Sequence, residues 1–227
     1  MQREIDINEI SDGKKYQIND MVKISCNDCD GCSECCRNMS GLITLDPYDI
    51  FRLLSDKEKL KLSNAESGFQ ALLADGRIEL TVDRGLLIPC LKMSSQTNAC
   101  TFLSSEGRCS IHDIRPGICR LFPMGRLYEN DSFYYFLQKN ECSYKLKTKI
   151  KLKNWLDTPE IQKYEKYICD WHYFCSDIIE YLSNASEDEA KQINEIESKG
   201  VKVYFQETPN HSVTEWDSVC KKVFPNI

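Results

Sequence analysis

The chain has 227 residues, with 41% hydrophobic and 28% charged side chains, a formal net charge of −6 and a pI near 5.2. This acidic balance argues against a general nucleic-acid binder, which needs a basic stripe to displace counterions from phosphate groups. No stretch approaches the ~18 consecutive apolar residues of a membrane-spanning helix, and the charged N-terminus lacks the apolar core of a signal peptide. We therefore expect a cytoplasmic protein of one domain, or of one domain with an appendage, that binds neither nucleic acid nor membrane.

The first third of the chain contains an arm, a cysteine-rich loop and two predicted helices. Residues 1–24 are expected to form an N-terminal arm with one or two short extended pieces. Residues 25–41 are too rich in Cys, Gly, Ser and Asp for a regular element. Asp46 is a favourable N-cap before a proline, which predicts a helix over 47–55. A second short helix is expected over 67–74, because an Asp-Gly pair follows it.

Two hairpins are predicted in the middle of the chain. Residues 77–82 and 85–93 read as strands on either side of a turn at Asp83-Arg84-Gly85. Residues 125–138 predict a second hairpin, which turns at Glu129-Asn130-Asp131. The segment between the two hairpins is rich in cysteine and is expected to have little regular structure.

From about residue 148 the sequence is predicted to be helical. Apolar side chains recur with a helical period at 161, 164, 168, 171, 175, 178 and 182. Further helices are expected over 186–198 and 213–223. Three cysteines of this part are predicted to serve packing, because a buried free cysteine behaves as a small hydrophobe; they are Cys169, Cys175 and Cys220.

These elements predict an α+β fold, with short strands and hairpins around an irregular, metal-nucleated, cysteine-rich core and a helical C-terminal cap. The metal-binding region is expected over 25–146 and the helical part over 147–227. The sequence TKIKLKNWLDTP between them is too apolar for a free linker. We therefore expect the two parts to pack together.

Thirteen cysteines against three histidines dominate the chemistry of the sequence. A disulfide framework, a metal or iron–sulfur site and a redox relay are the three arrangements that would use them. The odd number of cysteines and a reducing compartment disfavour disulfides. Because cysteines outnumber histidines, a bound metal would be held mainly by sulfur, which selects zinc, Cu(I) or iron–sulfur clusters.

The densest cysteine run is CNDCDGCSECC, residues 26–36. Cys29, Cys32 and Cys35, joined by a distant fourth cysteine, match the three-ligand run of ferredoxin-type [4Fe–4S] sites. Cys29 and Cys32 with a distant pair would instead match a structural zinc site, and the spacing leaves both alternatives open. The surplus of thiols favours the iron–sulfur cluster. Cys36 points away from its neighbour Cys35, which also leaves a two-site arrangement open.

A second cysteine-rich stretch ends in a short predicted helix that begins at Pro116. It places Cys119 in the first turn, where the helix dipole favours thiolate. Arg115 and Arg120 flank this cysteine and are predicted to bind the cofactor, because a four-thiolate centre carries a charge of about −2 that guanidinium groups offset. The alternative for both arginines is pairing with surface carboxylates. His112 is a further candidate ligand, although a hydrogen-bonded histidine is the simpler interpretation.

Three blocks follow one another along the chain: CDGCSECC over 29–36, CTFLSSEGRCSIHDIRPGICRLFP over 100–123, and ECS over 141–143. Together they resemble the YkgJ-type cysteine-cluster family, which is described as a zinc- or iron-chelating domain. The resemblance implies eight metal ligands, which are Cys29, Cys32, Cys35, Cys36, Cys100, Cys109, Cys119 and Cys142. It leaves Cys26 and Cys90 outside the core pattern, and it weakens His112 as a ligand because the family often has tyrosine there. It also implies a bacterial or archaeal cytoplasmic source.

The sequence therefore predicts a cysteine-cluster protein that holds iron, as a [4Fe–4S] cluster, or zinc. An electron-transfer protein is one alternative. A protein-modifying enzyme is another, because the same signature resembles that of flagellin lysine N-methylase. The chain has no GxGxxG-like loop after a predicted strand, which a conventional methyl-donor pocket would require.

Overall fold

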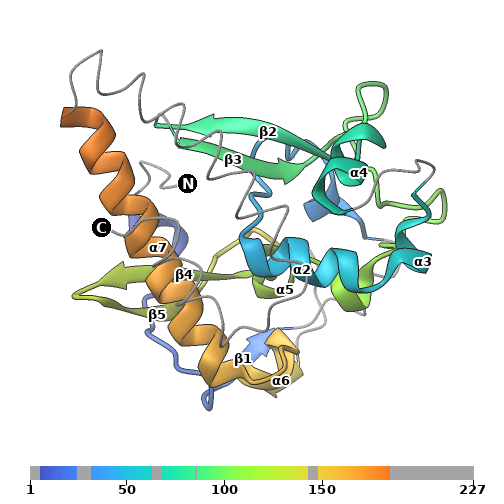
Figure 1. Ribbon diagram of the computed structural model, residues 1–227. Helices are drawn as coiled ribbons and strands as arrows, with labels where there is room; N and C mark the ends of the chain where they lie inside the picture. Colours follow the sequence, from blue (N-terminus) through green and yellow to red (C-terminus); the bar gives the residue numbers. More distant parts are fainter. Residues whose placement is uncertain (1–5, 25–31, 63–67, 85, 143–147, 185–227) are drawn as a thin grey trace.

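The computed structural model describes residues 6–24, 32–62, 68–84, 86–142 and 148–184 (Figure 1). Helices and small antiparallel sheets occur together, which confirms the predicted α+β class. The α-helices are α1 (Ile7–Ile10), α2 (Pro47–Ser55), α3 (Lys57–Leu60), α4 (Gly68–Ala74), α5 (Gly117–Leu121), α6 (Leu152–Leu156) and α7 (Ile161–Asn184). Two short 3₁₀ helices are η2 (Glu34–Cys36) and η3 (His112–Ile114). No helix in the described part of the chain is long and apolar enough to cross a membrane.

The strands of the described residues form three two-stranded antiparallel sheets. They are β1 (Met21–Ile24), β2 (Ile78–Asp83), β3 (Leu86–Leu91), β4 (Met124–Glu129), β5 (Ser132–Leu137) and β6 (Thr148–Lys151). The β2–β3 and β4–β5 hairpins confirm the two hairpins predicted from the sequence. The pairing of β1 with β6, in which Val22 lies opposite Ile150, was not predicted. It ties the N-terminal segment to the chain that leads into α6 and α7.

The start of α2 agrees with its prediction in detail. Asp46 is the N-cap, and its carboxylate accepts a hydrogen bond from the Asp49 amide at 2.9 Å. The Asp49 carboxylate accepts one in return from the Asp46 amide at 3.3 Å, which completes a capping box. Both carboxylates are buried, with Asp49 only 2% exposed. A cap on an isolated surface helix would be solvated, so these two acids also belong to the interior of the fold.

The two larger hydrophobic clusters of the described residues hold the fold together. The larger one joins α2, α4, the cysteine-rich loops and α7, through residues that include Ile50, Leu72, Ile111, Tyr164 and Ile168. The smaller one joins β1, the β4–β5 hairpin and α6, through residues that include Val22, Met124, Tyr135, Leu152 and Leu156. Each buried aliphatic or aromatic side chain contributes about 1.5–3 kcal/mol, so these cores fix how the elements are arranged.

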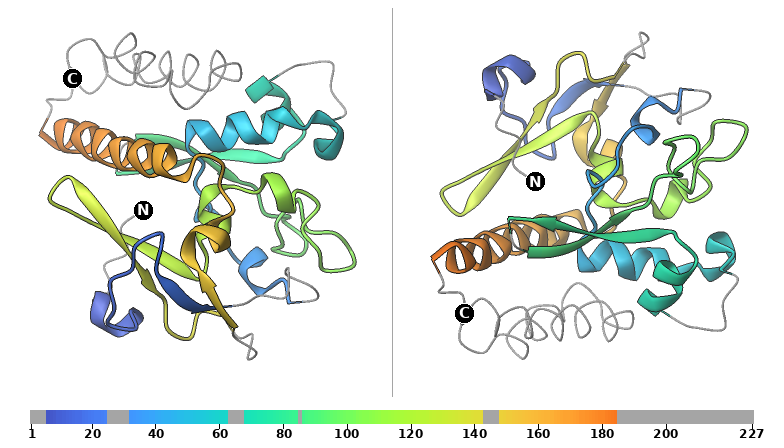
Figure 2. Two further views of the ribbon diagram at one scale, coloured as in Figure 1. Left: turned by 90° about the horizontal axis from the view of Figure 1, so that it is seen from below. Right: turned by 90° about the horizontal axis from the view of Figure 1, so that it is seen from above.

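Helix α7 contacts both hairpins (Figures 1 and 2). Ile178 and Ile179 pack against Leu86 of β3. On the side of the other hairpin, Cys169 donates a hydrogen bond from its thiol to the Asp131 carbonyl at 3.5 Å, and Tyr173 donates one to the Ser132 carbonyl at 3.3 Å. The predicted helices over 186–198 and 213–223 lie outside the described residues.

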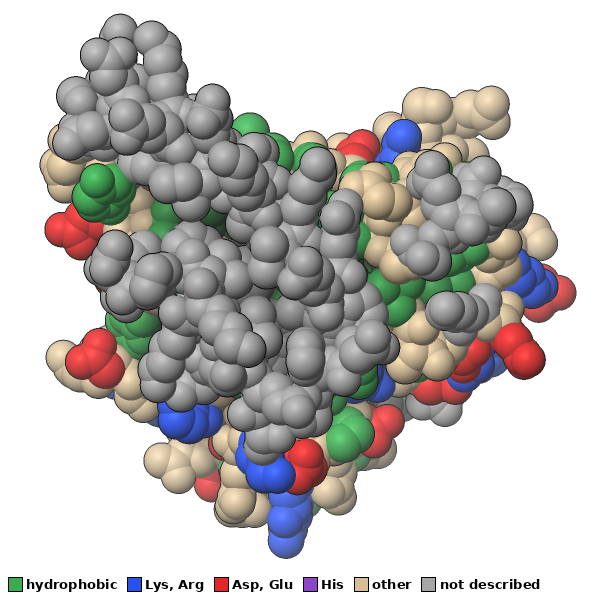
Figure 3. All heavy atoms as spheres, in the orientation of Figure 1, with side chains coloured by type: hydrophobic (Ala, Val, Ile, Leu, Met, Phe, Trp, Pro, Cys, Tyr) green, Lys and Arg blue, Asp and Glu red, His purple; other side chains and the backbone are tan. Residues whose placement is uncertain are grey.

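The face shown in Figure 3 carries both signs of charge, with acidic and basic side chains interspersed along its lower and right edges. Opposite charges also pair within the fold, since Lys59 forms ion pairs with Asp56 and Asp113. Among the described side chains of that face, no broad region of one charge is visible.

Helix α5 is packed so closely that its first residue must be glycine. The amide of Gly117 donates a hydrogen bond to Oδ1 of Asp49 at 2.7 Å, and the fully buried Tyr164 ring lies against the same residue. A Cβ atom at this position would overlap the Tyr164 hydroxyl oxygen. The close approach of α2, α5 and α7 therefore depends on the missing side chain.

We expect Gly117→Ala to lower the free energy of unfolding by about 1–3 kcal/mol, the usual cost of overpacking. The Tyr164 hydroxyl has no hydrogen-bond partner among the described residues, so Tyr164→Phe removes the overlapping atom at little cost. The double variant should therefore recover most of the lost stability in urea unfolding. If it is no more stable than Gly117→Ala, the Tyr164 oxygen is not what excludes a side chain.

Candidate metal centre

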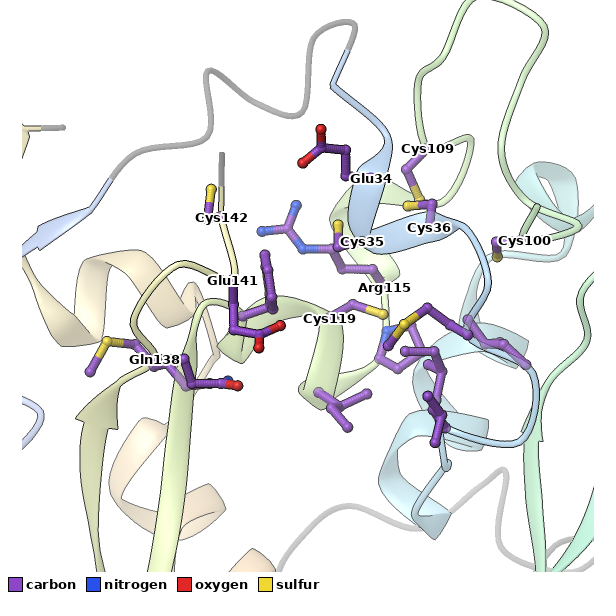
Figure 4. A pocket seen from close by; sticks show the side chains of 18 of the residues that line it. Glu34, Cys35, Cys36, Cys100, Cys109, Arg115, Cys119, Gln138, Glu141 and Cys142 are labelled. Carbon is purple, nitrogen blue, oxygen red and sulfur yellow. The ribbon is translucent and has the colours of Figure 1, made fainter. Parts of the chain in front are cut away.

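Seven of the eight predicted ligands line one cavity of about 370 Å³ (Figure 4). They are Cys32, Cys35, Cys36, Cys100, Cys109, Cys119 and Cys142. The eighth, Cys29, lies outside the described residues, as does Cys26. The tertiary structure thus brings together thiols that are separated by more than a hundred positions in the chain.

Backbone pairing between two loops places the first two groups of thiols side by side. Cys35 and Cys36 lie on η2, and the Cys36 carbonyl accepts a hydrogen bond from the Cys100 amide at 2.8 Å. Leu103 pairs with Cys109 in an isolated bridge, which folds the second loop back on itself. This arrangement brings the thiol groups of 35, 36, 100 and 109 to one side of the cavity.

Cys119 enters the cavity from a third direction. It lies in the first turn of α5, as predicted, and its position there is set by the contacts of Gly117 described above. Figure 4 shows Cys119 facing the same space as Cys35, Cys100 and Cys109. With Cys142, which follows β5, four separate segments of the chain contribute sulfur to the cavity.

Burial favours the neutral form of these thiols in the absence of a cation. Desolvation raises the pKa of Cys100 to about 11 and also raises the pKa of Cys109. The pKa of Cys119 is raised well above its usual value, first by desolvation and then by the neighbouring Cys100, Cys35 and Cys109. These four thiols are therefore close enough to influence one another's charge. A bound metal would replace their protons and supply the positive charge that the thiolates lack.

The donor set fits a soft metal, because the cavity offers sulfur rather than clustered imidazole or carboxylate groups. Within the described residues, however, no three His, Cys, Asp or Glu side chains are grouped closely enough to hold a metal ion. The thiols are distributed around the wall of the cavity and do not converge on a single point. The carboxylates of Glu34 and Glu141 also lie at this cavity, and nothing in their sequence context had marked them.

The two arginines that the sequence placed at the cofactor have different surroundings. Arg115 lines the cavity and contacts the His112 ring. Burial raises the pKa of Cys109, and the positive charge of Arg115 lowers it in part. Arg120 does not belong to the cavity wall and is only 2% exposed. Its Nη1 donates to the Arg115 carbonyl at 2.5 Å and its Nε to the Thr158 hydroxyl at 3.1 Å. Arg115 therefore faces the thiols directly, whereas Arg120 supports the backbone next to it.

The other cysteines of the described residues lie away from the cavity. Cys90 is fully buried in β3, and Cys175 packs with Ile178 and Ile179 of α7, which supports the packing role predicted for it. Cys169 bonds to a hairpin carbonyl, as described above. The predicted packing cysteine Cys220 lies outside the described residues.

A comparison with protein families identifies the domain. Residues 28–148 match the model described as "CxxCxxCC: Putative zinc- or iron-chelating domain". The chain belongs to this family. Membership in the CxxCxxCC family supports metal binding, with zinc or iron as the metal, and the matched range includes all eight predicted ligands. No match was found among curated proteins or among solved structures.

The cavity predicts which cysteines control metal content. We expect Cys119→Ser and Cys32→Ser to lose most of the bound metal and to become sensitive to protease across the cysteine-rich region, because metal binding is coupled to the order of its ligands. Cys175→Ala and Cys90→Ala, which remove thiols outside the cavity, should keep the metal content of the unmodified protein. Elemental analysis together with limited proteolysis measures both effects. Equal metal loss in all four variants would contradict the division of the cysteines.

Proposed function

We propose that this CxxCxxCC protein is an iron–sulfur protein whose cluster, of the [4Fe–4S] type, is held by thiolates of the cavity. The inner ligands are Cys35, Cys100, Cys109 and Cys119, with the other thiols of the cavity available to complete or exchange the set. The observation that carries the proposal is that these four thiols, from three chain segments, line one cavity. The family description supports iron or zinc and does not choose between them.

The spread of the thiols favours a cluster over a single zinc ion. Four thiolates around a tetrahedral zinc lie only ~3.8 Å apart, as follows from a Zn–S bond of ~2.3 Å. A four-iron cluster holds its ligands further apart, because each cysteine binds a different iron atom. Sulfurs that line a cavity of about 370 Å³ without forming a close group suit the larger cofactor better.

When bound, the cluster supplies one-electron chemistry, and the protein supplies its ligands and its electrostatic environment. Arg115 offsets negative charge from the cavity wall, and the apolar side chains of Ile43, Leu91 and Ile111 line the same cavity and limit water beside the thiols. An electron-transfer role follows most directly from this arrangement.

A protein-modifying enzyme is the second candidate, and the shape of the cavity favours it. The thiols occupy only part of the wall, and the cavity continues past them along Ile7, Ile10, Leu127 and Phe136. Catalytic metal centres keep a coordination position for a substrate, which needs space beside the ligands, whereas structural sites are filled by their ligands. A methyl donor or a modified protein side chain retained by the purified protein would favour this candidate.

The identity of the cofactor is tested by anaerobic purification. We expect brown protein with broad absorption near ~400 nm and comparable amounts of iron and acid-labile sulfide, as thiolate-ligated iron–sulfur clusters show. Colourless protein with stoichiometric zinc and no sulfide would reject the iron–sulfur proposal and leave a zinc protein of the same family.

The two arginines provide a matched test of the electrostatic environment. Arg115→Gln should lower the reduction potential of the cluster, because it removes a positive charge that faces the thiols. Arg120→Gln should mainly lower the free energy of unfolding, because its guanidinium group bonds to Thr158 and to a backbone carbonyl. Voltammetry and urea unfolding of fully loaded variants separate the two effects. An unchanged potential in Arg115→Gln would remove the role assigned to this side chain.

A further inference from the structure

We infer that Asp49, a helix-capping residue 70 positions before Cys119, is a positioning residue for that thiol. The inference rests on the proposed function in so far as Cys119 is a ligand of the cluster. Asp49 reaches Cys119 through the amide of Gly117, which is its neighbour two residues back on α5.

The first turn of α5 has no acceptor of its own. The first amide groups of any helix have no partner within the helix, and a side chain at the N-cap usually supplies one. In α5 the N-cap is Pro116, which makes no side-chain hydrogen bond. Oδ1 of Asp49, from α2, accepts the bond from Gly117 at 2.7 Å instead. The carboxylate of one helix therefore acts as the cap of another.

Asp49 can hold α5 firmly because Asp49 is itself fixed from several directions. Its amide donates to Asp46, and its Oδ2 accepts from the Asp46 amide. Asp46 in turn accepts a hydrogen bond from the Tyr167 hydroxyl at 3.3 Å, and that hydroxyl accepts one from the Tyr48 amide at 3.3 Å. These hydrogen bonds connect the segment that carries Cys119 to α2 and α7, the two longest helices of the described chain.

The arrangement places a buried acid beside a ligand thiol, which costs electrostatic energy. Burial raises the pKa of Cys119 and Asp49 adds to that rise; burial also raises the pKa of Asp49, and Arg120 lowers it in part. The hydrogen bond to Gly117 explains this placement, because a buried amide without an acceptor would destabilise the fold.

Two substitutions separate positioning from general stability. Asp49→Ala removes the acceptor of the Gly117 amide. Asp49→Asn keeps an oxygen for that amide but turns its NH₂ group toward the Asp46 amide, so it weakens the cap of α2 while it preserves the bond to α5. The asparagine variant is therefore the matched control for damage to α2.

The first measurement is site-resolved alkylation of the full-length protein with its metal bound, read by mass spectrometry. We expect Asp49→Ala to speed alkylation of Cys119 about fivefold or more, the change in local opening that the loss of one hydrogen bond produces. Cys175, which is packed against β3, should react at an unchanged rate. Asp49→Asn should leave both rates close to those of the unmodified protein.

The second measurement is the visible and electron paramagnetic resonance spectrum of the loaded protein. Asp49→Ala should change the spectrum or lose occupancy, and Asp49→Asn should do neither. The inference is overturned if Asp49→Ala leaves Cys119 alkylation unchanged, or if it accelerates Cys119 and Cys175 equally, since the second result reports general loosening. Full metal retention in Cys119→Ser would instead reject the ligand role of Cys119 in the proposed function, whatever the alkylation rates show.

Discussion

The contact between Asp49, Gly117 and Tyr164 is the constraint on which the arrangement of the metal centre depends. It joins the first turns of α2, α5 and α7, and it leaves no space for a side chain at Gly117. Cys119 follows two residues later, so its place at the cavity is fixed by a contact between helices rather than by its own loop. The loops that carry Cys36 and Cys100 are joined to each other by a hydrogen bond from the Cys100 amide to the Cys36 carbonyl.

Charge is distributed around this contact in an uneven way. Behind α5 lie two buried acids, and desolvation raises the pKa of Asp46 to about 8 while it also raises the pKa of Asp49. Arg120 is buried among them, whereas Arg115 faces the thiols. On the cavity side of α5, burial raises the pKa of the Cys100 and Cys119 thiols and so favours their neutral form in the absence of a metal. A cationic cofactor would supply the positive charge that is missing beside these thiols. Cofactor binding and the local order of α5 are therefore expected to strengthen each other.

The shape of the cavity connects the metal centre to function. A purely structural site would be enclosed by its ligands, but here the thiols share the cavity with apolar residues of α1 and of the β4–β5 hairpin. The CxxCxxCC family assignment supports metal binding, and the cavity extends beyond the thiols along these apolar residues.

The sequence by itself determined the features that depend on neighbouring residues. Asp46 and Pro47 specified the start of α2, the turn residues specified both hairpins, and the apolar period specified α7, because caps, turns and helical faces are local properties. The spacing of the cysteines likewise pointed to a metal-binding family. Only the tertiary structure decided which groups meet. The pairing of β1 with β6, the different directions of Arg115 and Arg120, and the bond from Gly117 to Asp49 join residues that are distant in the chain or depend on what surrounds them. No periodicity records such contacts, since they arise when the buried faces of separate elements pack together.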